Sequence, residues 1–231
     1  PDGSVILIAG SGPSRSLADV ELMDPINDRL EVLSPTLEEH SDHAAISLDD
    51  GRIFVSGGVR LLDEVVTSVG AEIYDFKTNT WTKTSLQSRR TSAHTLTLLK
   101  DGKVIQVGGF SGGSSDNRVE LYDPITDEWL EVPVMNKARM LHTTSLLDDG
   151  RVIAVGGTSR AGNMIESEIY NPETQMWIQS GNMVEARASH TATILSDGKI
   201  LIVGGTNTNS GICEIYDSKT GSWTSSKPAI E

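Results

Sequence analysis

Four evenly spaced histidines are the residues of this sequence best suited to metal chemistry. They are His43, His94, His142 and His190, and each lies 14 residues before a pair of glycines. Imidazole is a common zinc ligand, but the ligands must converge to about 2 Å from one ion. Because the histidines belong to different repeat units, we expect them to lie far apart, and we expect each to form a hydrogen bond within its own unit. We expect His40 to lie outside this pattern. We therefore predict no metal site and no cofactor.

A nucleophile motif, Gly-x-Ser-x-Gly, occurs at residues 109–113 around Ser111. A nucleophile elbow requires a strand, a sharp turn and a helix, whereas this stretch leads from one expected strand into another. Cys213 is the single cysteine, and we interpret it as a small packed side chain at the start of a strand. The sequence offers no unique acid, base or nucleophile, so we predict no catalytic residue and a protein that is not an enzyme.

The composition and net charge of the chain argue against some classes of binding partner. The chain has 231 residues and a formal net charge of −13. Nucleic-acid binding requires clustered Lys and Arg for phosphate contacts, so this charge argues against it. No apolar stretch approaches the roughly 18 residues of a membrane-spanning helix, and we predict no membrane insertion. The 22 glycines favour many turns and few long helices.

Three landmarks repeat with a period of about 48 residues, and repeats of this length indicate a solenoid, a propeller or a related array. The first is Asp-Gly followed by an apolar run and a small-residue pair, the second is Glu-φ-Tyr-Asp-Pro-x-Thr-x-x-Trp, and the third is Arg-x-x-His-Thr. The spacing from the Trp of one unit to the His of the next is always 13 residues, with Leu30 replacing the first Trp. All four Trp and all four Tyr occupy repeat positions.

Each unit predicts four short antiparallel strands, named a to d. Examples are strand a at 191–195, strand b at 199–203, strand c at 119–122 and strand d from Trp129. Asp-Gly suits the a–b hairpin because Gly accepts a positive φ, and the Pro segment suits the c–d turn. Four strands per unit and no 3.6-residue period predict an all-β propeller of four-stranded blades.

These landmarks resemble the kelch repeat over essentially the whole chain. The resemblance implies one β-propeller domain over residues 1–231, with units at approximately 1–34 (partial), 35–85, 86–133, 134–181 and 182–231. We expect four complete blades and a leading blade without strand a, in a ring of five or in an excerpt of a longer propeller, and we favour the excerpt. The details are most similar to bacterial and secreted copies, including galactose-oxidase-like propellers, which implies an extracellular location.

Residues common to every unit are expected to hold the propeller together. Large aromatic side chains at the Tyr and Trp positions should pack between neighbouring blades. The glycine pairs should allow close approach of two backbones rather than bind phosphate, since a phosphate loop needs a following helix.

Residues that differ between units are better candidates for binding. In such a blade the b–c and d–a connections share one face, and the b–c loops differ in every copy. Binding residues concentrate on variable loops of a rigid scaffold. The candidate partner-binding residues on this face are Arg15, Arg60, Leu61, Leu62, Arg89, Ser114, Asn117, Arg118, Arg160, Asn163, Asn207 and Asn209.

Charge suggests the chemistry of the partner. Eight of the 11 arginines fall in b–c or d–a segments, and Arg binds carboxylates through paired hydrogen bonds. The alternative is that Arg139 and Arg187, which repeat, support the blades, and that neighbours such as Asp116 neutralise others.

Two functions are compatible with this sequence. The first is a non-enzymatic scaffold that binds a protein or peptide through the b–c and d–a loop face, and an acidic partner is one option for it. The second is the propeller of a carbohydrate-active enzyme, similar to a galactose oxidase or a sugar epimerase, with its catalytic residues outside this chain. A glycan or small molecule is the alternative ligand.

Overall fold

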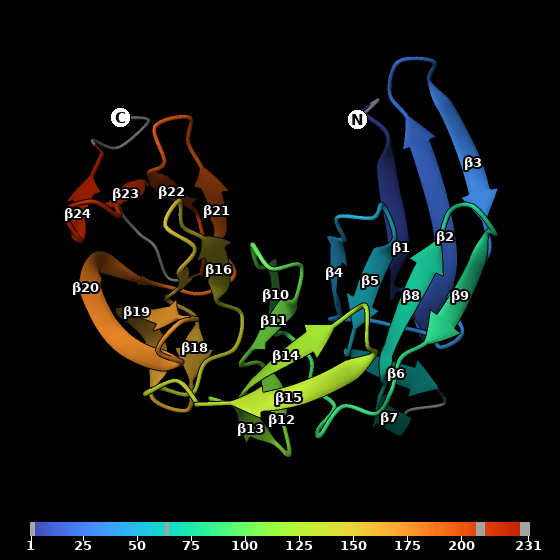
Figure 1. The fold of residues 1–231 in the computed structure, drawn as a ribbon, viewed down its shortest axis with the longest axis horizontal. Helices are drawn as coiled ribbons and strands as arrows, with labels where there is room; N and C mark the ends of the chain where they lie inside the picture. The colour runs from blue at the N-terminus through green and yellow to red at the C-terminus, as the bar shows by residue number, and fades with distance from the viewer. Residues whose placement is uncertain (1–2, 63–64, 207–210, 227–231) are drawn as a thin grey trace. The chain divides into compact units, whose positions relative to one another are not determined.

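The computed structural model describes residues 3–62, 65–206 and 211–226, and these residues form strands and turns without a helix. The chain divides into two compact units, residues 1–93 and 94–231 (Figure 1). Within the described ranges there is no helix long and apolar enough to span a membrane.

The first unit contains two antiparallel sheets and one separate hairpin. Its leading sheet has three strands in the order β1-β2-β3, namely β1 (Val5–Ser11), β2 (Ser16–Asp24) and β3 (Arg29–Leu33). The next sheet has the order β4-β5-β8-β9, namely β4 (Ala44–Ser47), β5 (Ile53–Ser56), β8 (Ala71–Asp75) and β9 (Thr80–Lys83). The hairpin of β6 (Val59–Leu62) and β7 (Val65–Ser68) lies between β5 and β8.

The second unit contains three sheets of the same kind. The first has the order β10-β11-β14-β15, namely β10 (Thr95–Leu98), β11 (Val104–Val107), β14 (Val119–Asp123) and β15 (Glu128–Val132). The second pairs β16 (Thr143–Leu146), β17 (Val152–Val155), β19 (Gly162–Asn171) and β20 (Met176–Arg187) in that order. The third pairs β21 (Thr191–Ile194), β22 (Ile200–Val203), β23 (Glu214–Asp217) and β24 (Ser222–Ser225).

Each four-stranded sheet is a meander in which consecutive main strands pair antiparallel, which confirms the all-β fold of propeller-type blades. The a–b turns form where Asp-Gly was expected, with φ of +86° at Gly51 and +90° at Gly150. Side chains such as Asp149 accept the amide hydrogen of the residue two positions later, which stabilises the tight turn. In the described part of the chain the leading sheet consists of strands b, c and d, and the total number of blades stays a prediction.

The core consists of apolar clusters between neighbouring sheets of one unit. In the second unit, Tyr170 and Trp177 pack in one cluster with Val119 and Val132 of the preceding sheet. The Trp177 indole also donates to the Pro133 carbonyl at 3.0 Å. Each Tyr lies opposite a Trp of its own sheet, with ring centroids 4.8 to 5.2 Å apart. The predicted packing of these aromatics between blades is therefore confirmed for the pairs Tyr74–Trp81, Tyr170–Trp177 and Tyr216–Trp223.

The glycine pairs lie where two backbones meet. A Cβ on Gly58 would lie 2.5 Å from the Ser41 carbonyl oxygen, and one on Gly156 would lie 2.7 Å from that of Arg187. Both glycines also have a positive φ. Close backbone approach, the structural role predicted for these pairs, is confirmed.

Three b–c connections expected as loops contain short hairpins instead. Besides β6–β7, they are the hairpin of β12 (Phe110–Ser111) and β13 (Ser114–Ser115) and the pairing of β18 (Thr158–Ser159) with the start of β19. Gly112 and Gly113 both have a positive φ, which suits a two-residue hairpin turn. The hairpins satisfy backbone groups that an irregular loop would leave to water. Ser111 thus lies in a hairpin and not at a strand-to-helix turn.

Candidate functional site

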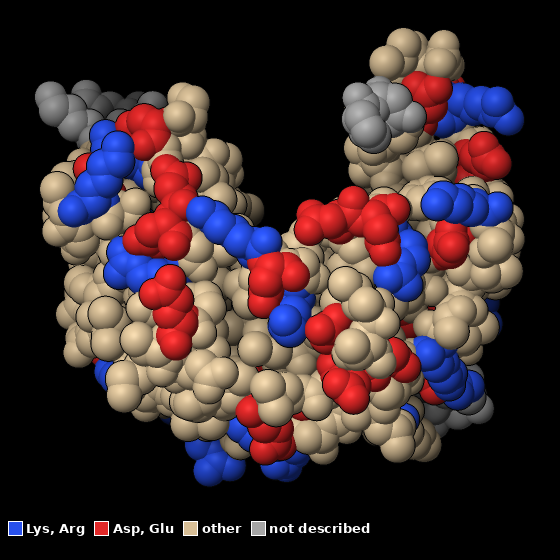
Figure 2. All heavy atoms as spheres, viewed as in Figure 1, with Lys and Arg blue, Asp and Glu red and all other residues tan. Residues whose placement is uncertain are grey.

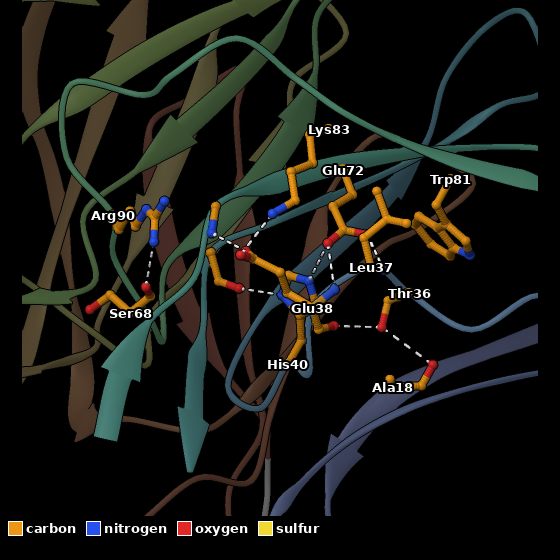
Figure 3. Close-up of polar contacts among 12 residues, drawn as sticks. Ala18, Thr36, Leu37, Glu38, His40, Ser68, Glu72, Trp81, Lys83 and Arg90 are labelled. Atoms are coloured by element: carbon orange, nitrogen blue, oxygen red, sulfur yellow. Dashed lines mark hydrogen bonds and ion pairs between the residues drawn. The ribbon is translucent and has the colours of Figure 1, made fainter. Parts of the chain in front are cut away.

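In three of the sheets, a buried glutamate of strand c anchors the segment that leads into that sheet. Glu72 accepts the backbone amides of Leu37 and Glu38 at 2.7 and 2.9 Å, and Figure 3 shows both contacts. Glu168 and Glu214 do the same, and their amide donors are Asn136, Lys137, Val184 and Glu185. Backbone donors satisfy a buried carboxylate, which would otherwise be costly to remove from water.

The repeated arginines complete these anchors. Arg139 and Arg187 have no exposed side-chain surface. Arg139 donates to the Glu168 carboxylate at 2.8 Å and to the Gly156 carbonyl at 2.6 Å, while its own carbonyl accepts the Gly109 amide at 2.8 Å. Its side chain therefore binds the sheet that follows, and its backbone binds the sheet that precedes. These arginines join blades, and their side chains are not available to a partner.

His40 takes the place of the arginine in the first unit. Its Nδ1 lies 2.8 Å from the Gly57 carbonyl oxygen and its Nε2 lies 3.5 Å from the Glu72 carboxylate (Figure 3). It precedes His43 by three residues, as Arg139 precedes His142. The prediction that His40 lies outside the repeat was wrong. His40 could have been recognised from its position three residues before His43. It was missed because two other units have an arginine at that position.

Two of the repeated histidines, His142 and His190, connect neighbouring sheets. The Thr95 hydroxyl lies 3.1 Å from Nε2 of His142, and the Thr143 hydroxyl lies 2.9 Å from Nε2 of His190. In both cases the threonine belongs to strand a of the preceding sheet, so the expected bond within one unit was wrong. Burial, followed by the nearby charge of Arg187, lowers the pKa of His190 to about 4. Among the described residues, no group of three or more His, Cys, Asp or Glu side chains could hold a metal ion.

Three of the predicted binding residues converge on one groove in the second unit. The groove has a volume of about 710 Å³, and Ser114, Arg160 and Asn163 line it. They come from two different hairpins, β12–β13 and β18–β19. Arg160 is exposed and forms no ion pair with the described part of the chain. The Asn163 amide donates to the Thr206 carbonyl at 3.0 Å, which fixes its orientation.

The sequence did not identify the other side chains that line this groove, among them Ser115, Lys137, Met164 and Glu166. Lys137 and Glu166 form an ion pair. The hydrogen bond from Lys137 lowers the pKa of Glu166 and outweighs its burial, so Glu166 is a carboxylate at neutral pH. Since Lys137 already has a carboxylate partner, Arg160 is the cation of this groove that remains open to a ligand.

Other predicted residues are occupied by internal contacts. Arg118 pairs with Asp116, and the Asn117 amide donates to the Met135 carbonyl at 3.0 Å. Arg60 lies 3.3 Å from Glu39. The alternative that acidic neighbours neutralise some of the arginines is therefore confirmed for Arg60 and Arg118.

The remaining candidates do not line this groove. Arg15 and Arg89 are exposed and Leu61 is half-buried, and all three belong to the first unit. Asn207, Asn209 and the side chain of Leu62 lie outside what the structure describes.

A second depression lies among the a–b and c–d turns. It has a volume of about 470 Å³ and is lined by residues that include Lys100, Asp149 and Arg151. These charges are satisfied internally, because Arg151 pairs with Asp149 and Lys100 donates to the Asp148 carbonyl. In both units Figure 2 shows Lys and Arg interspersed with Asp and Glu on the face drawn. The groove at Arg160 is therefore the stronger candidate site.

Comparison with known families agrees with the fold. A model of the kelch motif matches residues 98–136 and 187–228. No curated protein matches the chain. The matched segments cover strands β11 to β15 and β21 to β24, which carry the Asp-Gly turn, the glycine pair and the Tyr–Trp pair. The kelch motif at two places in the chain and the four-stranded antiparallel sheets support a kelch-repeat family for this protein.

Proposed function

We propose that this protein is a non-enzymatic interaction module that binds a protein or peptide through the groove between the β12–β13 and β18–β19 hairpins. Kelch motifs generally serve as protein-interaction repeats. The observation that carries the proposal is the exposed guanidinium of Arg160, which lacks an ion-pair partner within the described residues and shares the groove with Ser114, Ser115 and Asn163.

The chemistry of the groove favours one acidic side chain of the partner. A guanidinium binds a carboxylate through two parallel hydrogen bonds, and serine hydroxyls can donate to the same group. Glu166 lies in the same groove as a carboxylate, and its charge repels a second acid placed beside the first. A single Asp or Glu between neutral residues fits this arrangement better than an acidic run.

The titratable side chains in the groove also support a role in binding and not in catalysis. Lys137 and Glu166 are ion-paired with each other. A general acid or base needs a pKa near the working pH, whereas the pKa of Glu166 is lowered by Lys137.

Peptide selection tests this proposal. A random peptide library is selected against the full chain, and the enriched peptides are measured for affinity to the wild type, Arg160→Ala and Arg160→Lys. We expect enrichment of one Asp or Glu, a loss of about 10- to 100-fold in Arg160→Ala, as for a charged hydrogen bond, and partial retention in Arg160→Lys. Arg89→Ala is the matched control because Arg89 is also exposed but lies outside the groove. Peptides without an acid, or equal affinity for Arg160→Ala, would contradict the proposal.

A further inference from the structure

The hairpin of β6 and β7 in the first unit is longer than the hairpin of β12 and β13. Its strands have four residues each, whereas β12 and β13 have two each. All four residues of β7 are exposed, and two of them are apolar, Val65 at 61% and Val66 at 63% exposure. The groove at Arg160 does not account for this exposed apolar strand.

The hydrogen bonds of the hairpin show which backbone groups of β7 point outward. In an antiparallel pair, residues that exchange hydrogen bonds alternate with residues whose amide and carbonyl groups point away from the partner strand. The Val69 amide donates to the Gly58 carbonyl at 3.2 Å, and the register continues without a shift along β7. The backbone groups of Ser68 and Val66 therefore point outward.

The outward side of β6 confirms this alternation. The Leu61 amide donates to the Ser16 hydroxyl at 2.9 Å. Val59 exchanges two backbone hydrogen bonds with Ser41, at 2.8 and 2.9 Å. These contacts cover the outer edge of β6 with other segments of the first unit.

The outward side of β7 is covered at one group. The Ser68 carbonyl accepts the Arg90 guanidinium at 2.9 Å, as Figure 3 shows. Within the described residues, the Ser68 amide and the amide and carbonyl of Val66 have no hydrogen-bond partner, and β7 pairs only with β6. A strand edge with such groups can receive an extended segment of another chain.

Arg90 determines the charge beside this edge. The Ser68 carbonyl carries no net charge, so it does not neutralise the guanidinium. The carboxylate of Glu38 lies within range of the Arg90 charge but is paired with Lys83 at 2.9 Å (Figure 3). A carboxylate placed at the end of β7 would therefore be attracted by Arg90.

We propose that β7 is a second recognition site, which takes an extended segment of a partner protein as an added antiparallel strand. The segment places a β-branched apolar residue opposite Val66 and an acidic residue two positions earlier, opposite Ser68 and beside Arg90. β-Branched side chains pack well against one another across neighbouring strands. A second copy of this chain fits less well, because two molecules with a net charge of −13 repel each other. This site is independent of the groove at Arg160, which belongs to the other unit.

The test uses the peptide acetyl-Ser-Glu-Thr-Val-Val-Thr-amide, in which Glu and the first Val take the two specified places. It is added to the full chain, and binding is followed by calorimetry and by residue-resolved amide hydrogen exchange. We expect saturable binding and at least about a 10-fold slowing of exchange at Val66 and Ser68, since hydrogen-bonded amides must open before they exchange. Absence of binding, or protection confined to other strands, would overturn the proposal.

Methylation of the peptide backbone tests strand addition without changing the protein. An N-methyl group on the first Val removes the donor to the Val66 carbonyl and should abolish binding. An N-methyl group on the Thr before it is the matched control, because that amide points away from β7, and the affinity should stay within about 3-fold. If the two methylated peptides bind equally well, or if neither binds, strand addition is refuted.

The acidic residue is tested by replacing Glu of the peptide by Gln. We expect binding to the wild type to weaken by about 5-fold, as for an exposed ion pair, and binding to Arg90→Ala to be the same for both peptides. Arg160→Ala should bind the peptide like the wild type. Equal affinity of the Glu and Gln peptides for the wild type, or loss of binding in Arg160→Ala, would overturn the proposal. Protection of Val66 and Ser68 that rises with protein concentration in the absence of peptide would identify a second copy as the occupant and overturn it also.

Discussion

Arg139 donates to the Glu168 carboxylate at 2.8 Å, although the two side chains are only 0% and 2% exposed. The pair fastens the segment that precedes β16 to β19 of the same sheet, and the Arg139 carbonyl binds the Gly109 amide of the sheet before. Two backbone amides also bind the same carboxylate. The two charges are thus paired with each other inside the protein. Loss of either side chain would leave the other as a buried charge without its partner, which is strongly destabilising.

Replacing Arg139 by Met should destabilise the protein strongly. The substitution leaves Glu168 as a buried carboxylate without a cation, and breaking a buried pair in this way costs about 3–5 kcal/mol. The measurement is the free energy of unfolding by urea denaturation. Arg151→Met is the matched control, because the Arg151–Asp149 pair is 29% and 51% exposed and such pairs contribute less than about 1 kcal/mol. Equal losses in the two variants would contradict the role of burial.

Replacing Gly156 by Ala should disrupt a contact between sheets. The new Cβ would lie 2.7 Å from the Arg187 carbonyl oxygen, so two backbones would have to separate. We expect a loss of more than about 2 kcal/mol, in the range of overpacked cores. Gly221→Ala is the control, since Gly221 also has a positive φ but nothing lies within 4 Å of its Cβ position. It should lose only the roughly 1 kcal/mol of backbone strain. If both variants lose the same amount, close approach is not the reason for glycine at position 156.

The buried His190 predicts that stability falls in mild acid. Its pKa is about 4 in the folded protein and about 6.5 when unfolded, so the unfolded state binds more protons between these values. The stabilisation is complete above pH 6.5 and is lost as the pH falls toward 4, by about 2 kcal/mol at pH 5. His190→Gln should show a smaller difference in unfolding free energy between pH 7 and pH 5. An unchanged difference would exclude His190 as a contributor.

Restoring arginine at position 40 should stabilise the first unit. His40 lies 3.5 Å from Glu72, whereas the arginines at equivalent positions lie 2.8 and 3.2 Å from their glutamates. Charged hydrogen bonds contribute about 1.5–3 kcal/mol, and part of this should be gained by His40→Arg, as a rise in melting temperature. Arg139→His should lower it in the second unit. A lower melting temperature for His40→Arg would mean that the surrounding residues have adapted to imidazole.

Much of the fold could be predicted from the sequence because the determining residues repeat. Asp-Gly turns, glycine pairs and Tyr–Trp pairs each act over short distances, so a local pattern was sufficient to define strands and blades. The pairing of Tyr122 with Trp129, for instance, follows from their position on either side of one turn.

The contacts between sheets could be predicted only in part. The sequence indicated that the histidines are structural, but not that His142 meets a threonine 47 residues earlier. That contact depends on how one sheet packs on the next, which the spacing within a unit does not determine. His40 was missed for a related reason, since it fills the arginine's position with a different side chain.

The candidate site was the least predictable part. Ser114, Arg160 and Asn163 were identified because they lie in variable connections, and the structure brings them to one groove. Arg118 came from the same reasoning but pairs with Asp116. Whether an arginine is free to bind depends on side-chain directions in short hairpins, and these hairpins were expected as irregular loops.

The backbone contact between Arg139 and Gly109 also has a consequence for folding during synthesis. The Gly109 amide is satisfied by a carbonyl about 30 residues later in the chain, and the same holds for Gly10 with His40 and Gly157 with Arg187. A ribosome must therefore synthesise the whole of one repeat and the first residues of the next before this glycine amide can acquire its partner. Until then, the glycine pair of the newest sheet stays open to chaperones or proteases.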